Sequence, residues 1–180
     1  MISIWFEPHG TTPDNESKLA SGWNDVDLSP RGLREAQELV ERAKERSVDA
    51  IFCSDLQRAV KTAIPTANTL HIPIYADARL RECDYGDMTG QPSSQIEAER
   101  SLRIDTPFPN GESYRQCMER MQGFYDELKA NFEGNKTILI IGHRATHYGV
   151  EVFCAGKTLE QCIADGAHWK WQPGWLYKVQ

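Results

Sequence analysis

The segment TILIIGHR, residues 137–144, decides the fold class. Its run TILIIG lacks the alternation of polar and apolar residues that marks a strand with one solvated face. Such a run is typical of a strand that is buried on both faces of a sheet. We therefore expect a central strand at residues 137–142, with His143 directly behind it and a helix following.

Short strands and helices alternate along the rest of the chain. Strand-like runs occupy residues 2–7, 49–53 and 72–76. Apolar residues recur at helical spacing at Leu33, Ala36, Leu39, Val40 and Ala43, at Leu56, Ala59, Val60, Ala63 and Ala67, and from Tyr114 to Phe132. Alternating strands and helices connect by right-handed crossovers, which produces a mostly parallel sheet with helices on both faces. We predict a three-layer α/β fold formed by a single domain over residues 1–180.

Local signals indicate where these elements begin and end. Ser29 and Pro30 are typical of a helix cap and first turn, and Ser54 with Gln57 matches a capping box. Pro65 predicts a kink in the helix that this box would open. Residues 91–110 are polar and irregular. The tail alternates around a Pro-Gly pair, which favours an antiparallel pair at one sheet edge, with Trp169, Trp171 and Trp175 packed in its core.

The composition excludes several kinds of partner. The chain has 180 residues, enough for one sizeable core, and its net charge of -6 argues against nucleic acid as a partner. No apolar run is long enough to span a membrane, and the first residues carry no basic leader or cleavage site. The five cysteines are irregularly spaced, which is typical of reduced thiols. We expect a cytoplasmic protein; the oligomeric state stays open, a homodimer included.

Polar residues follow each of the predicted parallel strands. His9 comes after the first strand, Ser54 and Arg58 after the second, Glu82 after the third and His143 after the fourth. Ligands of open parallel sheets bind at the carboxyl ends of the strands. We therefore expect two histidines, an arginine and a carboxylate to meet at one rim.

This set of side chains suits phosphoryl transfer without a metal or other cofactor. A neutral His9 imidazole can attack phosphorus and hold the group covalently. Arg58 can grip two phosphate oxygens, and His143, if protonated, adds another donor to the developing charge. Glu82, if kept protonated, can give a proton to the leaving oxygen and later take one from water.

The same residues carry a resemblance to a known family. HGTTPDN (9–15), GWNDVDLSPRG (22–32), SDLQRAVKTA (54–63), LRECDYGDMTG (80–90), PNGES (109–113) and IIGHR (140–144) resemble, in order, the motifs of the histidine phosphatase superfamily, the phosphoglycerate mutase-like proteins. The resemblance implies a phosphoglycerate mutase-like fold. It also implies His9 as phospho-acceptor and Glu82 as proton donor. The implied phosphate pocket contains Arg58 and His143, with Gly10, Thr12, Asn15 and Trp23 nearby.

The sequence departs from the family pattern at three positions. Pro8 stands where the family has an arginine before the nucleophile, Glu7 replaces an apolar residue, and Arg144 replaces a glycine. Losing an arginine that binds phosphate costs on the order of a hundredfold or more in rate. We hypothesise that Arg144 reaches the same phosphate and replaces the missing cation.

We predict a cofactor-independent phosphatase that hydrolyses a small phosphate monoester. Three alternatives stay open: a phosphoglycerate-type mutase, a weakened phosphate-binding or regulatory protein, and a metal-dependent hydrolase that uses His9, His143 and His147. The substrate is expected to be chosen by residues 91–108 and around Trp23. The remaining histidines, His71 and His168, do not indicate a function. Arg100 and Arg103 are expected to form a solvated charged face, with contact to an anionic substrate as the alternative.

Overall fold

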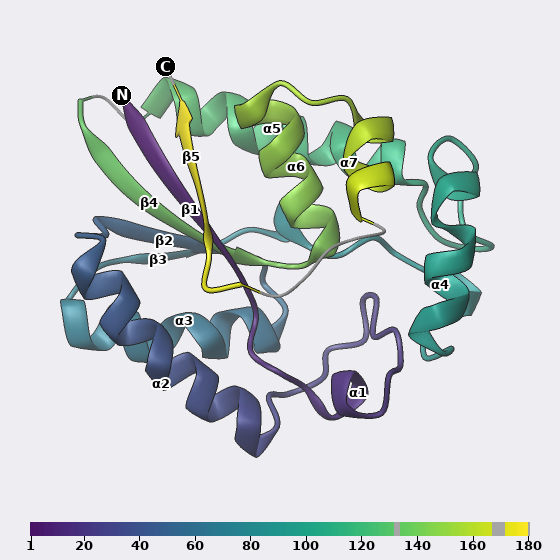
Figure 1. Ribbon diagram of the computed structural model, residues 1–180, viewed down its shortest axis with the longest axis horizontal. Helices are drawn as coiled ribbons and strands as arrows, with labels where there is room; N and C mark the ends of the chain where they lie inside the picture. The colour runs from purple at the N-terminus through teal and green to yellow at the C-terminus, as the bar shows by residue number, and fades with distance from the viewer. Residues whose placement is uncertain (132–133, 167–171, 180) are drawn as a thin grey trace.

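The computed structural model describes residues 1–131, 134–166 and 172–179. Its centre is a five-stranded sheet with the strand order β3-β2-β4-β1-β5 (Figure 1). The strands span Ile2–Pro8 (β1), Ala50–Cys53 (β2), Ile74–Ala76 (β3), Lys136–Gly142 (β4) and Trp175–Val179 (β5). The first four are mutually parallel, and β5 runs antiparallel to β1 at the edge. This confirms the predicted mostly parallel sheet with one antiparallel edge.

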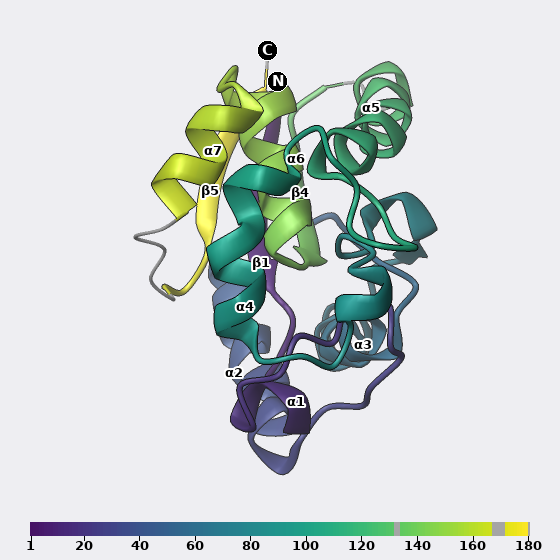
Figure 2. The ribbon, with the colours of Figure 1, turned by 90° about the vertical axis from the view of Figure 1, so that its right-hand side faces the viewer.

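Helices cover both faces of the sheet. In Figure 1, α2 and α3 lie below the sheet, whereas α5, α6 and α7 lie above it. The helices span Pro13–Glu16 (α1), Pro30–Glu45 (α2), Gln57–Leu70 (α3), Ser93–Glu99 (α4), Tyr114–Asn131 (α5), Arg144–Ala155 (α6) and Leu159–Gly166 (α7). Short 3-10 turns occupy Ala78–Leu80 (η1), Gly86–Met88 (η2) and Arg100–Arg103 (η3). The view in Figure 2 shows α4 in front of the sheet, on the side where the parallel strands end.

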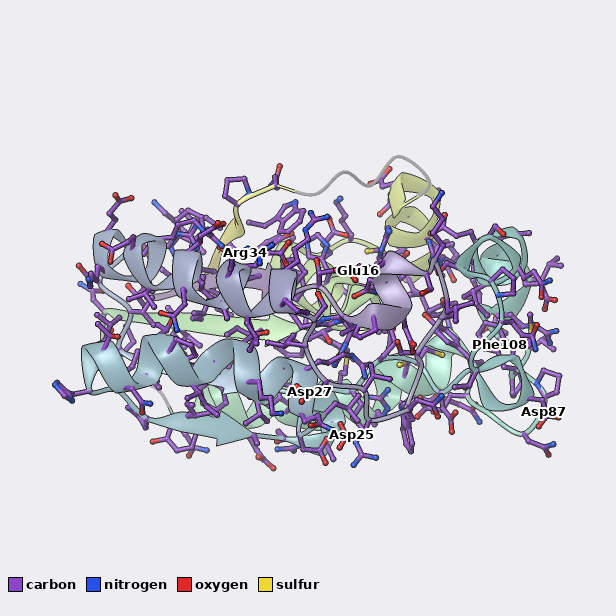
Figure 3. The ribbon with its side chains drawn as sticks, turned by 90° about the horizontal axis from the view of Figure 1, so that it is seen from below. Glu16, Asp25, Asp27, Arg34, Asp87 and Phe108 are labelled. Atoms are coloured by element: carbon purple, nitrogen blue, oxygen red, sulfur yellow. The ribbon has the colours of Figure 1, made fainter. Side chains whose placement is uncertain are left out.

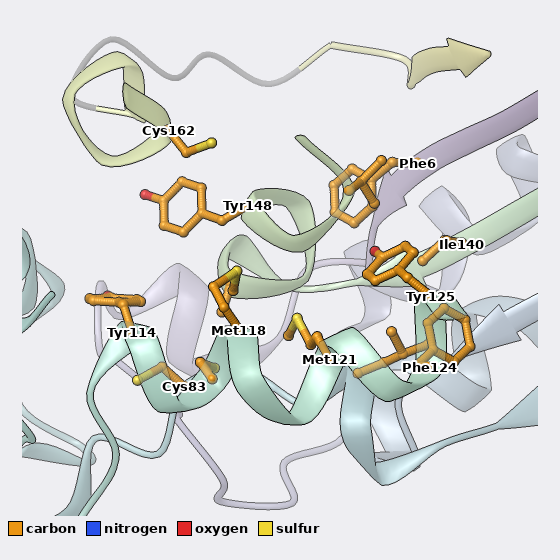
Figure 4. Close-up of a cluster of buried hydrophobic side chains, with 14 of the residues drawn as sticks. Phe6, Cys83, Tyr114, Met118, Met121, Phe124, Tyr125, Ile140, Tyr148 and Cys162 are labelled. Carbon is orange, nitrogen blue, oxygen red and sulfur yellow. The ribbon is translucent and has the colours of Figure 1, made fainter. Parts of the chain in front are cut away.

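The position of β4 between two cores explains why its sequence is apolar throughout. Ile138 and Ile140 belong to the core under α5 and α6, whereas Leu139 and Ile141 belong to the core against α2 and α3. Successive strand residues point to opposite faces, so both sets are buried. Figure 4 shows Ile140 beside the aromatic and methionine side chains that α5 contributes to the upper core.

The outer face of α2 carries many charged residues, among them Arg34, Glu38 and Glu41. Figure 3 views the molecule from that side, where Arg34 of α2 and the preceding loop residues Asp25 and Asp27 are labelled. Ser29 caps α2 by accepting a hydrogen bond from the amide of Gly32, and Pro30 opens its first turn. The predicted start of this helix is confirmed.

Two local predictions need correction. Ser54 does not cap α3; the amide of Gln57 donates instead to Asp25 Oδ1 at 2.7 Å, and Ser54 is used elsewhere. The helix continues through Pro65 to Leu70, and the kink at Pro65 stays a prediction. Within the polar segment 91–110, α4 and η3 form regular structure around the buried Ile96 and Arg100. These features depend on tertiary contacts that the local sequence does not reveal.

The tail places one strand at the edge, where β5 pairs with β1. Trp175 packs partly buried against the core, as predicted, whereas Trp169, Trp171, His168 and Phe132 lie outside the described residues. The five cysteines are free thiols, and four of them are buried. Among the described residues, no helix combines the length and apolarity that crossing a bilayer requires.

Candidate active site

The structure brings the four rim residues together. His9 follows β1, and its amide donates to the carbonyl of Gly142 at 2.9 Å, which continues the pairing of β1 with β4. His143 follows β4, and the centroids of the two imidazole rings lie 5.0 Å apart. Arg58 in the first turn of α3 and Glu82 after η1 line cavities that His9 also lines. The convergence expected from strand order is therefore present.

His9 is held as a neutral base. Its Nδ1 lies 2.7 Å from the carbonyl oxygen of Gly10. A carbonyl can only accept, so Nδ1 carries the proton and Nε2 keeps its lone pair. Burial, reinforced by the nearby charge of Arg58, lowers the pKa of His9 from 6.5 to about 3. Nε2 is therefore unprotonated at neutral pH and keeps a lone pair that can accept a proton or attack an electrophile.

Close backbone packing fixes the loop that carries His9. The amide of Gly10 donates to Thr62 Oγ1 of α3 at 2.9 Å. A Cβ at Gly10 would lie 2.6 Å from the carbonyl oxygen of Gly32, and one at Gly32 would lie 2.0 Å from that of Thr11. The loop therefore rests directly on the first turn of α2, and this close approach leaves room only for glycine at either position.

Arg58 is a buried cation beside both histidines. Its side chain is 1% exposed. Nη1 and Nη2 donate to the carbonyls of Asn24 and Gly22, each at 2.8 Å. Nε has no hydrogen-bond partner among the described residues. A buried polar group in this state is expected to gain a partner from solvent or from a ligand.

His143 is also a neutral imidazole. Burial lowers its pKa well below 6.5, and the charge of Arg58 acts in the same direction. Its Nε2 lies 2.6 Å from Ser54 Oγ, which is the actual role of the serine predicted to cap α3. Nδ1 is buried and has no partner within the described part of the chain. The imidazole can therefore offer one N–H donor while it stays neutral, so the protonated form considered from the sequence is not needed.

Glu82 is fixed against the start of α6. Its Oε1 accepts from the amides of Cys83 at 2.9 Å and Ala145 at 3.0 Å, and its Oε2 accepts from the amide of Arg144 at 3.1 Å. The carboxylate thus occupies the amino end of the helix, where N–H groups lack intrahelical partners. It still lines both cavities that contain His9.

A cavity of about 360 Å³ surrounds these groups. His9, Glu82 and His143 line it together with Asn15 and Arg144, as predicted for the site. The carboxylate-bearing Glu35 and its partner Arg31, both on α2, also line it and were not anticipated. The positions of these two residues in the predicted helix did not indicate a place in the site, because they reach it only through the packing of α2 on the His9 loop.

Other predicted binding residues are not lining residues of this cavity. Thr12 is fully buried and caps α1, with its amide and hydroxyl both donating to Asn15 Oδ1. Trp23 lies behind Glu82, where its indole N–H donates to the Glu82 carbonyl at 2.7 Å. The indole also faces the guanidinium groups of Arg81 and Arg120. Gly10, Thr12 and Trp23 therefore hold neighbouring parts of the chain in position and do not line this cavity.

The three residues predicted to depart from the family pattern have separate surroundings. Pro8 lines the cavity beside His9, so no arginine emerges there. Glu7 points away from the cavity and is 2% exposed; it pairs with Arg42 at 3.1 Å and Arg46 at 2.7 Å. Arg144 donates from Nη1 to the Gly166 carbonyl at 3.0 Å. Arg144 also lines both cavities that His9 lines, so its replacement of the arginine missing at position 8 stays a hypothesis.

The two arginines expected on a solvated face differ. Arg103 pairs with Glu99, and its side chain is 20% exposed. Arg100 is only 7% exposed and lines a second cavity that His9, Arg58 and Glu82 also line. The expectation was therefore wrong for Arg100, because η3 turns it inward from a segment that looked irregular.

The metal hypothesis finds little support in the described residues. His147 Nε2 lies 2.7 Å from the Tyr177 hydroxyl, and its ring stacks on Phe6 with centroids 4.5 Å apart. The described residues contain one close group of metal-ligating atoms, from Cys83, Glu112 and Cys117. There the guanidinium of Arg120 already contacts Glu112 at 2.8 Å and Cys117 Sγ at 2.9 Å. A cation at that position is unfavourable for a metal ion.

Fold and site together define an α/β protein with two histidines, an arginine and a carboxylate at one rim. The sequence pattern of the histidine phosphatase superfamily (branch 1) matches residues 4–150, and the chain belongs to that family. It is 34% identical over 146 residues to the uncharacterized phosphatase PhoE of Bacillus subtilis (strain 168), covering 81% of this chain and 73% of that protein.

Other relatives carry different activities in their names. The chain is 32% identical over 167 residues to a protein named "Probable phosphoglycerate mutase GpmB" from Proteus mirabilis (strain HI4320), covering 88% of this chain and 75% of that protein. A solved mycobacterial glucosyl-3-phosphoglycerate phosphatase in complex with VO3 superposes with a TM-score of 0.78 at 25% identity, covering 90% of this chain and 86% of that one. The chain is thus a phosphatase- and phosphoglycerate mutase-like protein.

Proposed function

We propose that this protein is a cofactor-independent phosphatase that hydrolyses a small phosphate monoester through a phosphohistidine on His9. The observation that carries the proposal is the state of His9. Its Nδ1 is tied to the Gly10 carbonyl and its pKa is about 3, so Nε2 is free to attack in a cavity with Arg58, His143 and Glu82 close by.

The first half of the reaction forms the phosphoenzyme. His9 Nε2 attacks phosphorus, and the bond from phosphorus to the leaving oxygen breaks. Arg58 Nε has no partner among the described residues and can donate to the transferring group. His143 Nδ1 can do the same in the tautomer in which the Ser54 hydroxyl donates to Nε2. Glu82, in its protonated form when the substrate is bound, gives its proton to the leaving oxygen, which departs as an alcohol.

The second half returns the enzyme to its starting state. A water molecule attacks phosphorus, and Glu82 takes the proton that this water loses. The bond between phosphorus and Nε2 breaks, inorganic phosphate leaves, and His9 is again neutral. The names of several relatives as phosphatases support hydrolysis as the outcome.

Turnover of p-nitrophenyl phosphate in EDTA tests the proposal. We expect His9→Asn to lose about 10³-fold or more of the activity. The matched control is His71→Asn, because His71 is an exposed residue at the left-handed C-cap of α3, a position that asparagine tolerates. Unchanged turnover in His9→Asn would reject the nucleophile, and loss of wild-type activity in EDTA would reject a metal-free reaction.

Pro8 supports a second candidate, a weakened enzyme that chiefly binds phosphate compounds. The site lacks one cation where the family pattern has an arginine, while Arg58 and the two histidines remain. Binding of inorganic phosphate by calorimetry, without turnover of any monoester, would favour this reading. Isomerisation of phosphoglycerates with little release of phosphate would instead favour a mutase.

A further inference from the structure

A second cavity extends the site away from the proposed phosphate position. It has a volume of about 190 Å³ and shares His9, Arg58, Glu82 and Arg144 with the site described above. Its far wall comes from α4 and η3, which contribute Glu97 and Arg100 among others. A substrate whose phosphate lies beside His9 can therefore place the rest of the molecule against these charged side chains.

Arg100 is a buried cation with few contacts. Its side chain is 9% exposed, and its Nη2 lies 3.2 Å from Glu97 Oε1. Nε reaches the Tyr114 hydroxyl only at 3.4 Å, and Nη1 has no hydrogen-bond partner in residues 1–131, 134–166 and 172–179. Burying a guanidinium is costly unless anions and hydrogen-bond acceptors surround it.

Arg120 shows how this chain holds a buried arginine that serves the fold. Its Nε pairs with Glu112 at 2.8 Å, and Nη1 and Nη2 donate to the carbonyls of Arg79 at 2.6 Å and Glu82 at 2.8 Å. Further bonds reach the Arg81 carbonyl and the second oxygen of Glu112. Arg100 has none of this dense set of short contacts, so a purely structural role does not account for its burial beside the cavity.

The position of Glu97 shows where an anion fits. Its Oε1 lies 3.2 Å from Nη2 of Arg100 and 3.9 Å from Nη2 of Arg144. Two guanidinium groups thus share one carboxylate oxygen, and the side chain of Glu97 remains 47% exposed. Because a half-exposed carboxylate can rotate away into solvent at small cost, a ligand oxygen of the same charge can take its place.

We propose that Arg100 and Arg144 form a subsite for a second anionic group of the substrate, a carboxylate or a second phosphate. The inference rests on the proposed function and narrows its substrate class to phosphate monoesters that carry another anion. Glu97 is the internal counterion of this subsite, and it gives way to the second anion. Arg144 then serves this subsite and does not stand in for the arginine that the family pattern has at position 8.

Calorimetric titration tests the subsite without requiring turnover. The probes are 3-phosphoglycerate and glycerol 3-phosphate, which share a phosphate and three carbons and differ by one carboxylate, with propane-1,3-diol bisphosphate as a second-phosphate probe. We expect the wild-type protein to bind at least one doubly charged probe ten times or more tighter than glycerol 3-phosphate. The stronger of the two identifies the chemistry of the second anion.

The variants separate the subsite from general damage. The affinity ratio is the affinity for the doubly charged probe divided by that for glycerol 3-phosphate. In Arg100→Met this ratio should fall to about one, whereas Arg103→Met on the same turn should keep it. Glu97→Gln should raise the ratio, because the competing carboxylate is gone. Equal affinities for all probes in the wild type, or a ratio that survives Arg100→Met, would overturn the proposal. p-Nitrophenyl phosphate turnover, measured on the same samples, reports the proposed hydrolysis separately.

Discussion

Replacing Pro8 with arginine should make this protein a faster phosphatase. Pro8 ends β1, pairs in register with Gly142, and lines the cavity of about 360 Å³ beside His9. The resemblance to the family predicts a cation at this point of the cavity. The substitution would add a donor next to the oxygens of the transferring phosphoryl group.

The size of the gain follows from the charges already present. One preorganised donor at a developing oxyanion is worth about 10²–10³-fold in kcat. Glu35 lines the same cavity, and its carboxylate is already bonded to the amide and hydroxyl of Thr11 and to Arg31. A new guanidinium will interact partly with Glu35, so we expect a smaller gain, about tenfold to a hundredfold, or about 1.4–2.7 kcal/mol.

The assay is steady-state hydrolysis of p-nitrophenyl phosphate in EDTA. Pro8→Met is the matched control, because it offers a flexible side chain of similar reach without charge. We expect kcat to rise in Pro8→Arg and to stay near the wild-type value in Pro8→Met. Equal rates in the two variants would refute the reasoning that the missing charge limits turnover.

Three further predictions concern stability and positioning. Burial lowers the pKa of His147 from 6.5 to about 3, so between these pH values the unfolded chain binds a proton that the folded protein does not. The free energy of unfolding should therefore fall by about 1.4 kcal/mol for each pH unit below about 6.5, until about pH 3. In urea unfolding, His147→Phe should lose less of its free energy of unfolding over this pH range. Gly32→Ala, with its 2.0 Å contact, should lower the free energy of unfolding by about 1–3 kcal/mol, whereas Gly123→Ala on the exposed face of α5 should raise it by about 0.5–1 kcal/mol. Ser54→Ala should lower kcat by up to about tenfold, because His143 loses the partner that orients its ring; an unchanged rate would make that bond irrelevant.

The strand pattern was sufficient to predict the fold. The apolar run of β4 needs cover on both faces, and its alternate residues do enter two separate cores. Strand order then places His9 and His143 at the same rim, because both follow parallel neighbours in the sheet. Periodicity and chain order are properties of the sequence itself, so this part of the site could be predicted.

Contacts between distant segments could not be predicted in this way. Ser54 has the spacing of a cap, yet its hydroxyl bonds to His143, which lies 89 residues away. Arg100 looked like a surface residue because the segment around it is polar, and only the packing of η3 beside the cavity buries it. Glu35 likewise reaches the site through α2, whose docking on the His9 loop depends on two glycines.

Trapping the covalent intermediate tests the central claim most directly. The protein would be mixed with a ³²P-labelled monoester, quenched in alkali or in acid within milliseconds, and digested to locate the label by mass spectrometry. We predict a label on His9 that survives alkali, disappears in acid and is absent from His9→Asn. A protein that hydrolyses the ester at full rate while no label appears on His9 would contradict the account.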